Sequence, residues 1–242
     1  MKKISYSIIL LVGFLSGLNV CAQVHFNIYT EAGKNNVSEG FYMKTAAIGT
    51  IWLAKNRIEL GGQFDVISPN NNRSQALLVN YTREFPLKKL SLEPQCFFMY
   101  NHFSEVLFET NWGVTLGAGF RHFYLKLGTN FRTYGIPKNA IKKYDITNHE
   151  NIHENFNIMY SASYFVKLPE HKWNIGITLT NIDNFLINQE TNPVFYLHGK
   201  YQINQLFTIY SEAWYKSAGA FNLSVNPFGF FIRTGFIWSI KY

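Results

Sequence analysis

Apolar and polar residues alternate along the chain, most regularly in residues 228–242, which read FGFFIRTGFIWSIKY. Every second residue from Phe228 belongs to an almost wholly apolar and aromatic set, whereas the residues between are smaller on average and include Arg233 and Lys241. Successive side chains of an extended strand point to opposite faces, so this pattern predicts a strand with one apolar face. The stretch is longer than the roughly 9–11 tilted residues that cross a bilayer.

The same alternation, interrupted by turn residues, recurs along the chain and predicts twelve strands. We expect them at about residues 24–32, 41–54, 58–67, 75–85, 90–103, 107–120, 123–134, 155–167, 172–182, 193–203, 206–217 and 228–242. Tight turns alternate with longer outside loops, among them 135–154 and 183–192, and only 104–106 breaks this alternation. The arrangement is typical of an all-β, antiparallel, up-and-down transmembrane barrel with both termini in the periplasm. Ten strands are the alternative, because boundaries predicted from sequence carry an error of a few residues.

The faces of the predicted strands support a membrane barrel. In the strand 172–182, Trp173 and Ile175 fall on one face and Asn174 on the other, and other strands divide in the same way. Apolar side chains outward and polar or small ones inward are typical of a barrel in lipid. A soluble β-sandwich would need a solvated outward face, which the aromatic content argues against. An open sheet in lipid would leave unpaired backbone groups at its edges, so the last strand should pair with the first, 24–32.

The end of the chain carries a family resemblance. An alternating final strand that ends in an aromatic residue, here Tyr242, resembles the terminal strand of bacterial outer-membrane β-barrels. The resemblance implies that the barrel-assembly machinery recognises this strand, and that outer-membrane lipids and lipopolysaccharide surround the protein. No second domain, plug segment or internal repeat is visible, so we expect residues 23–242 to form one barrel domain.

The start of the chain, MKKISYSIILLVGFLSGLNVCAQ, reads as a secretory signal with a basic region, an apolar segment and a small-residue cleavage site. We expect cleavage after Ala22, so that residues 1–22 are a signal peptide and Gln23 is the first mature residue. A mature chain that begins in this way is similar to exports of the Bacteroidota, which are Gram-negative. Cleavage would leave Cys96 as the remaining cysteine, which excludes an intrachain disulfide.

Composition agrees with an exported barrel. The chain is 17% aromatic and 15% charged, whereas roughly a quarter of residues are charged in a soluble domain. No segment after the signal offers the ~20 continuous apolar residues of a membrane helix. The net charge is +7, but the basic residues are scattered, so we expect no nucleic-acid partner. Lipopolysaccharide phosphates or an anionic solute are better candidates for what this charge attracts.

The candidate solute path consists of charged residues with inward parity. They are Glu59, Asp65, Glu93, Glu109, Lys126, Arg132, Lys167, Lys200, Glu212, Lys216 and Arg233. The acids come mainly from the first half of the chain and the bases from the second, which predicts a transverse field across a narrow pore. The alternative is a plugged interior in which these charges form ion pairs.

We therefore expect a porin-like channel for small polar or charged solutes, or a barrel component of an envelope complex. A structural barrel with partner-binding loops is the alternative to both.

His102 and Ser104 lie near the outer end of a predicted strand, with the outward parity of Cys96. A His-x-Ser pair in this position resembles the catalytic pair of outer-membrane phospholipase A and of the lipid A deacylases, and implies a lipid hydrolase as a further alternative. Those families usually continue with Asn after the Ser, whereas this chain has Glu105, and a third residue to orient the imidazole is not evident. We expect no enzymatic activity.

Residues 149–153 match the H-E-x-x-H pattern. On a helix this spacing places two imidazoles on one face for zinc, with the Glu as general base. Here the pattern lies in the longest predicted loop, where three Asn residues disfavour a helix. We therefore expect a solvated polar loop, with no metal and no cofactor.

Overall fold

The computed structural model describes residues 22–35, 41–66, 75–147, 149–168, 172–188, 190, 192–216 and 228–241. These residues form one antiparallel sheet of thirteen strands. The strands are β1 (Ala22–Asn35), β2 (Phe41–Leu53), β3 (Asn56–Asp65), β4 (Gln75–Arg83), β5 (Phe85–Pro86), β6 (Ser91–Ser104), β7 (Leu107–Phe120), β8 (Phe123–Gly135), β9 (Ile152–Leu168), β10 (Trp173–Thr180), β11 (Val194–Gln202), β12 (Phe207–Lys216) and β13 (Phe228–Lys241). The expected signal peptide, apart from Ala22, lies outside the described residues.

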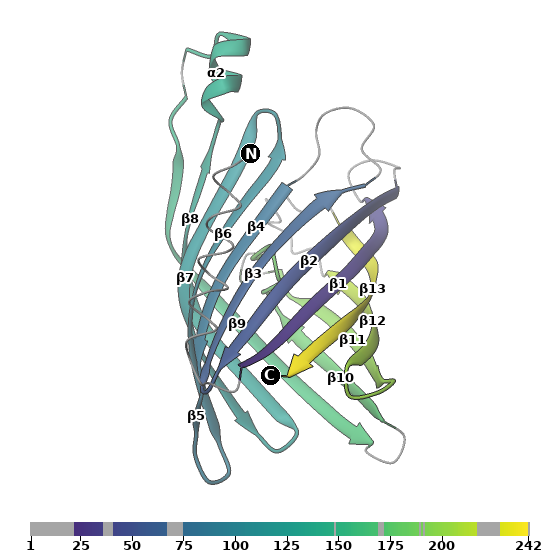
Figure 1. The fold of residues 1–242 in the computed structure, drawn as a ribbon. Helices are drawn as coiled ribbons and strands as arrows, with labels where there is room; N and C mark the ends of the chain where they lie inside the picture. Colours follow the sequence, from purple (N-terminus) through teal and green to yellow (C-terminus); the bar gives the residue numbers. More distant parts are fainter. Residues whose placement is uncertain are drawn as a thin grey trace.

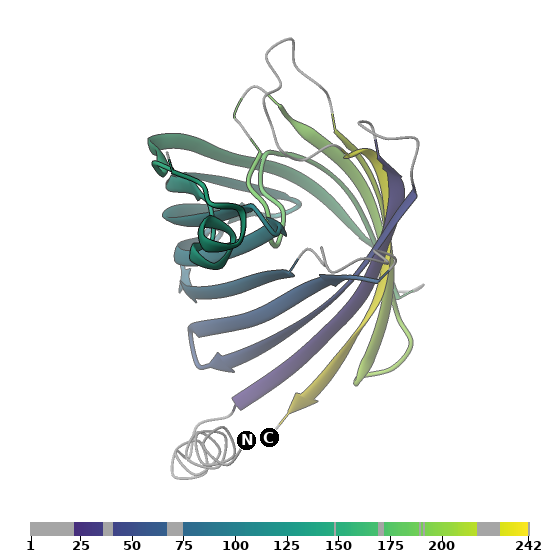
Figure 2. The ribbon, with the colours of Figure 1, turned by 90° about the horizontal axis from the view of Figure 1, so that it is seen from above.

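Twelve of these strands close into a barrel (Figures 1 and 2). β1 pairs with β13, from Gln23 opposite Lys241 to Asn35 opposite Phe228, and β4 pairs directly with β6. β5 is a two-residue extension of the hairpin between β4 and β6, so it takes no separate place in the ring. The predictions of twelve strands and of pairing between the last strand and the first are confirmed.

The two ends of the barrel differ in their connections. β1 begins and β13 ends at the end that carries the two-residue turns 54–55 and 121–122, which we call the short-turn end (Figure 1). Ala54 and Arg121 adopt left-handed backbone conformations there, with φ of 55° and 53°. The helix α2 (Lys138–Tyr144) stands at the opposite, long-loop end. That the short-turn end faces the periplasm stays a prediction.

Side-chain burial alternates along the strands as the parity predicts. On β7, Glu109 and Asn111 are buried inside the barrel, whereas Trp112 and Val114 are each 55% exposed on the outside. The other strands present apolar side chains outward in the same way: Phe26, Leu60, Val79, Leu127, Ile158, Ile177, Leu197, Ile209 and Ile232. Soluble monomers rarely expose a contiguous apolar surface of this extent. The outside of this barrel therefore suits lipid.

None of the helices in the described residues has the length and hydropathy needed to span a membrane.

Candidate functional site

The first part of the connection between β10 and β11 lies inside the barrel. β10 has 8 residues whereas its antiparallel neighbour β9 has 17, and Thr180 lies opposite Ser161 of β9. The chain therefore leaves the wall at Thr180, well short of the long-loop end of β9, where that strand begins at Ile152. The following residues, 181–188, which we call the lumen loop, lie within the ring of strands in Figure 2. We expected residues 183–192 to form an outside loop and saw no plug segment. For the lumen loop that prediction is wrong, because its apolar side chains pack against the inner wall.

Two apolar side chains anchor the lumen loop. Phe185 and Ile187 are each 2% exposed. They belong to a buried cluster with side chains from the inner faces of several strands: Tyr29, Ala46, Ile48, Ala76, Leu78, Phe97, Met99, Met159 and Tyr210. Burial of a Phe or Ile side chain contributes about 1.5–3 kcal/mol. The barrel thus has a small apolar core at mid-height, to which the lumen loop supplies two side chains.

Asn181 shapes the start of the lumen loop. Its side-chain amide donates to the carbonyls of Ile158 (2.7 Å) and Asn188 (3.2 Å), and its side-chain oxygen accepts the Tyr160 N–H at 2.8 Å. The Asn188 N–H donates to the Asn181 carbonyl at 2.8 Å, and Ile182 pairs with Ile187. These contacts make the loop a short hairpin fixed to β9 at its base.

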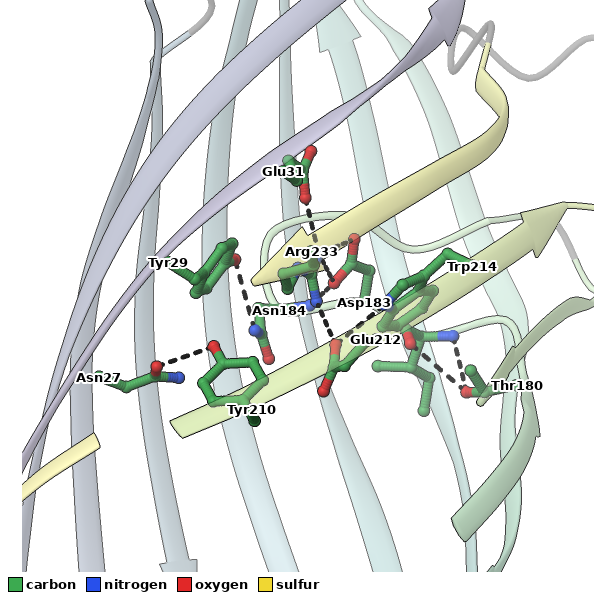
Figure 3. Close-up of polar contacts among 11 residues, drawn as sticks. Asn27, Tyr29, Glu31, Thr180, Asp183, Asn184, Tyr210, Glu212, Trp214 and Arg233 are labelled. Atoms are coloured by element: carbon green, nitrogen blue, oxygen red, sulfur yellow. Dashed lines mark hydrogen bonds and ion pairs between the residues drawn. The ribbon is translucent and has the colours of Figure 1, made fainter. Parts of the chain in front are cut away.

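Arg233, on β13, holds the lumen loop from one wall (Figure 3). Its guanidinium lies 2.9 Å and 3.0 Å from the two carboxylate oxygens of Asp183. It also contacts Glu31 of β1 at 2.8 Å and Glu212 of β12 at 3.4 Å. The rings of Tyr29 and Trp214 lie 4.5 Å and 4.7 Å from the guanidinium carbon. Arg233 is 2% exposed, and a buried charge is tolerated only when it is paired in this way.

Arg132, on β8, holds the lumen loop from another wall. Its guanidinium donates to the Ile187 carbonyl at 2.6 Å, to Asn111 at 3.0 Å and to Glu154 at 3.2 Å. Glu109 lies 3.8 Å away and accepts from Asn111 at 2.5 Å. β8 is five strands from β13 in one direction round the barrel and seven in the other. The two arginines therefore fix the loop from nearly opposite walls.

A polar cavity lies on the short-turn side of the lumen loop. Its volume is about 340 Å³, and Ile182, Asp183 and Asn184 form part of its lining. The lining residues from the wall are Arg57, Glu59, Leu78, Asn80, Gln95, Met99, Tyr124, Lys126, Ser161, Ser163, Phe165, Thr180, Tyr196, Glu212, Trp214 and Arg233. Arg57 lies 3.5 Å from Glu59, and Lys126 donates to Gln95 at 2.8 Å. The cavity is thus lined by side chains of both charge signs.

The structure places all of the charged residues of the candidate solute path on the inward-facing parity of the strands. They are Glu59, Asp65, Glu93, Glu109, Lys126, Arg132, Lys167, Lys200, Glu212, Lys216 and Arg233. The acids and bases do not form two separate walls, because Glu31 pairs with Arg233 and Glu109 with Arg132 across neighbouring strands. These ion pairs cancel much of the expected transverse field in the middle of the barrel.

Asp183 is the site residue that sequence reasoning missed. The period of two assigns a face to residues within strands but gives no direction for residues in a loop. The one available signal was the apolar run Phe185-Leu186-Ile187 inside a connection predicted to be outside. Such a run needs a place away from water, which in this barrel is the lumen.

The two enzyme-like patterns are placed as follows. The pairing of β6 with β7 is irregular between His102 and Ser104, and the Ser104 hydroxyl accepts the Val106 N–H at 3.3 Å. No hydrogen bond joins His102 to Ser104 in the described part of the chain. His149 lies in a coil and His153 near the start of β9, where it contacts Thr133 at 2.9 Å, so the pattern does not lie on a helix. The described residues contain no cluster of three or more potential metal-ligating side chains.

Comparisons with known proteins agree on the fold. No protein-family model and no curated protein sequence matches the chain. The solved structure of the KdgM porin matches with a TM-score of 0.56 and 11% identity, over 89% of this chain and 99% of that one. A KdgM porin in complex with disordered oligogalacturonate matches with a TM-score of 0.52 and 10% identity, over 90% and 99%. At such identity the likeness shows the fold alone, which is that of the outer-membrane β-barrels.

Proposed function

We propose that this protein is a porin-like channel of the bacterial outer membrane whose lumen is closed by the lumen loop. The observation that carries the proposal is the attachment of that loop to nearly opposite walls, through Asp183 to Arg233 and through the Ile187 carbonyl to Arg132. The barrel fold and the apolar outward face support a place in the outer membrane. Lipids and lipopolysaccharide would then surround the barrel, and the assembly machinery would recognise β13.

The way the loop is attached favours a gate over a permanent filling. Residues 183–186 take no part in the ladders between strands, so the loop can move while the ring of twelve strands stays paired. Segments held by side-chain contacts open at lower free-energy cost than core strands. Twelve strands also enclose more space than the side chains of the inner wall fill, as the cavity beside the loop shows.

The solutes that suit this lumen are small and polar or charged. The cavity beside the loop offers Arg57 and Lys126 as cations, and Glu59 and Glu212 as acids. A path lined by both signs attracts polar and zwitterionic molecules without a strong preference for one sign. Passage would proceed by diffusion when the lumen loop moves aside.

Conductance of the purified protein in planar bilayers tests the proposal. The wild type should show rare, small single-channel steps. Asp183→Asn removes the charged contact between loop and wall, and we expect at least about a tenfold rise in the ratio of open to closed time, equivalent to about 1.4 kcal/mol. Glu212→Gln is the matched control, because it removes a carboxylate from the same guanidinium without touching the loop. The absence of steps in both the wild type and Asp183→Asn would end the channel proposal.

The proposed function is non-enzymatic and uses neither a metal nor a cofactor. The alternative, a lipid hydrolase that uses His102 and Ser104, makes a different prediction. It requires wild-type hydrolysis of phospholipid or lipid A that the Ser104→Ala variant lacks. That result would replace the channel proposal, whereas equal activity of the two proteins would remove Ser104 from any catalytic role.

A further inference from the structure

Two adjoining cavities at the short-turn end are lined by basic residues. One, of about 430 Å³, is lined in part by Lys167, Lys172 and Lys200, and the other, of about 750 Å³, in part by Lys88, Lys89, Arg121, His122 and Lys167. They share Lys167 and Asn174. No acidic side chain of the described residues lines either cavity. We call these seven basic residues with Asn174 the basic vestibule.

Three neighbouring strands form the inner part of the basic vestibule. In the ladder, Asn174 of β10 lies opposite Lys167 of β9 on one side and opposite Lys200 of β11 on the other. Neighbouring strands are about 4.8 Å apart, so the backbones of the two lysines are separated by about 10 Å. Both lysines have the inward parity of their strands, toward the lumen and away from the surrounding lipid. Two long ammonium side chains at this separation can reach one ligand between them.

The cations of the basic vestibule differ from those deeper in the barrel. Arg233 has three carboxylate partners, Arg132 has two and Arg57 has two. In contrast, no carboxylate of the described residues lies within ion-pair distance of Lys167, Lys200 or the other basic groups of the vestibule. Two of these cations lie over aromatic rings: Lys200 over Tyr210 at 5.9 Å and Arg121 over Phe120 at 5.3 Å.

Unneutralised like charges in a concave site repel one another and raise the local concentration of counter-ions. Lysine ammonium groups act as compact point charges and as donors of up to three hydrogen bonds each, which suits phosphate oxygens. The same wall adds neutral hydrogen-bonding groups from Asn174, Gln202 and Thr208. A ligand with several negative charges would offset the repulsion that a monovalent anion leaves in place.

We propose that the basic vestibule is a binding site for soluble, multivalent, phosphate-bearing anions, held between Lys167 and Lys200. Lys172, at the rim, adds a third cation to the same cavity. This binding does not depend on the proposed channel function, because a barrel that stays closed can still take up an anion from the solution at its short-turn end.

Isothermal titration calorimetry of the refolded full barrel in a non-ionic detergent, with inorganic pyrophosphate as the probe, tests the proposal. We expect saturable binding that weakens as salt is raised, since salt screens exposed charges. The double variant Lys167→Gln, Lys200→Gln should raise the dissociation constant at least about tenfold. The matched control is Lys138→Gln, Lys142→Gln, which removes the same charge from α2 at the opposite end. The control should bind as the wild type does, and heat-modifiable migration on a gel verifies that each variant is folded.

Three results would overturn the proposal. They are the absence of saturable binding in the wild type, equal affinity in the vestibule variant, and an equal loss of affinity in the α2 control. A second titration distinguishes a soluble ligand from a lipid headgroup: it is carried out in nanodiscs of phosphatidylcholine with and without phosphatidylglycerol. Unchanged pyrophosphate binding supports the soluble ligand, and its abolition by phosphatidylglycerol overturns it. Conductance is not a readout here, so failure of the channel proposal leaves this test intact.

Discussion

Arg233 joins three separate parts of the chain at one guanidinium group. Glu31 comes from β1, Glu212 from β12 and Asp183 from the lumen loop. The rings of Tyr29 and Trp214 exclude water from its faces and add cation–π attraction. A single residue thereby links the seam between β1 and β13 to the lumen loop.

Removal of this guanidinium should destabilise the barrel strongly. Arg233→Gln leaves Glu31, itself 4% exposed, as a buried carboxylate without its cation. Breaking a buried pair from one side costs about 3–5 kcal/mol. We expect a loss of this size in the free energy of unfolding, measured by denaturant titration in lipid vesicles with a gel-shift readout. Arg121→Gln, an exposed arginine, should change the same quantity by less than about 0.5 kcal/mol. Equal losses in the two variants would contradict the structural role given to Arg233.

Strand parity predicted which residues face the lumen but not what they contact there. Glu212, Lys126 and Arg233 could be assigned inward because each lies within a regular strand with a period of two. The partners could not, because the shear between strands decides which inward residues become neighbours. Glu109 was therefore expected to face bases across the lumen, whereas it lies beside Arg132 on the adjacent strand.

At the scale of elements, the strands form where their sequence pattern predicted them, whereas the connection between β10 and β11 does not lie where it was predicted. The predicted strand 155–167 appears as β9 (Ile152–Leu168), with a register irregularity between Asn130 and Arg132 of its partner β8. The lumen loop was misplaced because its apolar run, residues 185–187, indicates burial but does not state on which side of the wall the loop lies. Its place results from burial of Phe185 and Ile187 against side chains that are distant in the chain.

The helix α2 is tied to the β6–β7 turn by a contact that should respond to pH. Glu105 accepts from Lys143 and from Tyr144, each at 2.7 Å. The Lys143 hydrogen bond, followed by that of Tyr144, lowers the pKa of Glu105 below its usual value. A lowered folded-state pKa means that the stabilisation is complete above the unfolded value, about 4.3. It is lost as pH falls through the lower, folded value.

We therefore expect α2 to be held at pH 7 and to be released on acidification below about pH 4. A dye attached to the thiol of a Lys142→Cys variant, in a Cys96→Ser background, reports that release as a fall in fluorescence anisotropy. Glu105→Gln cannot ionise, so in that variant the anisotropy should not change over this pH range. An acid-induced fall of the same size in Glu105→Gln would show that a different group is responsible.

At the scale of the whole molecule, charge is distributed along the axis of the barrel and not across it. The middle holds ion pairs around Arg132 and Arg233, and the short-turn end holds the basic vestibule, whose cations have no carboxylate partner among the described residues. The sequence showed the inward charges, but it could not show this axial order. Part of the order depends on Asp183 of the lumen loop, which lies in a connection that was wrongly predicted to be outside.

The membrane barrel itself makes a prediction that two neighbouring residues can test. Val79, at the centre of β4, is 47% exposed on the outer face, and Asn80 is 4% exposed on the inner face, where it donates to Glu59. Val79→Lys places a charge in the bilayer midplane, which costs about 2–4 kcal/mol. Asn80→Lys, at the same depth, places its charge beside Glu59 in a polar cavity and should cost much less. Unfolding titrations in vesicles of defined lipid compare the two directly. Equal costs would contradict an outward face in lipid, because a lysine at position 79 would then meet water and not the bilayer.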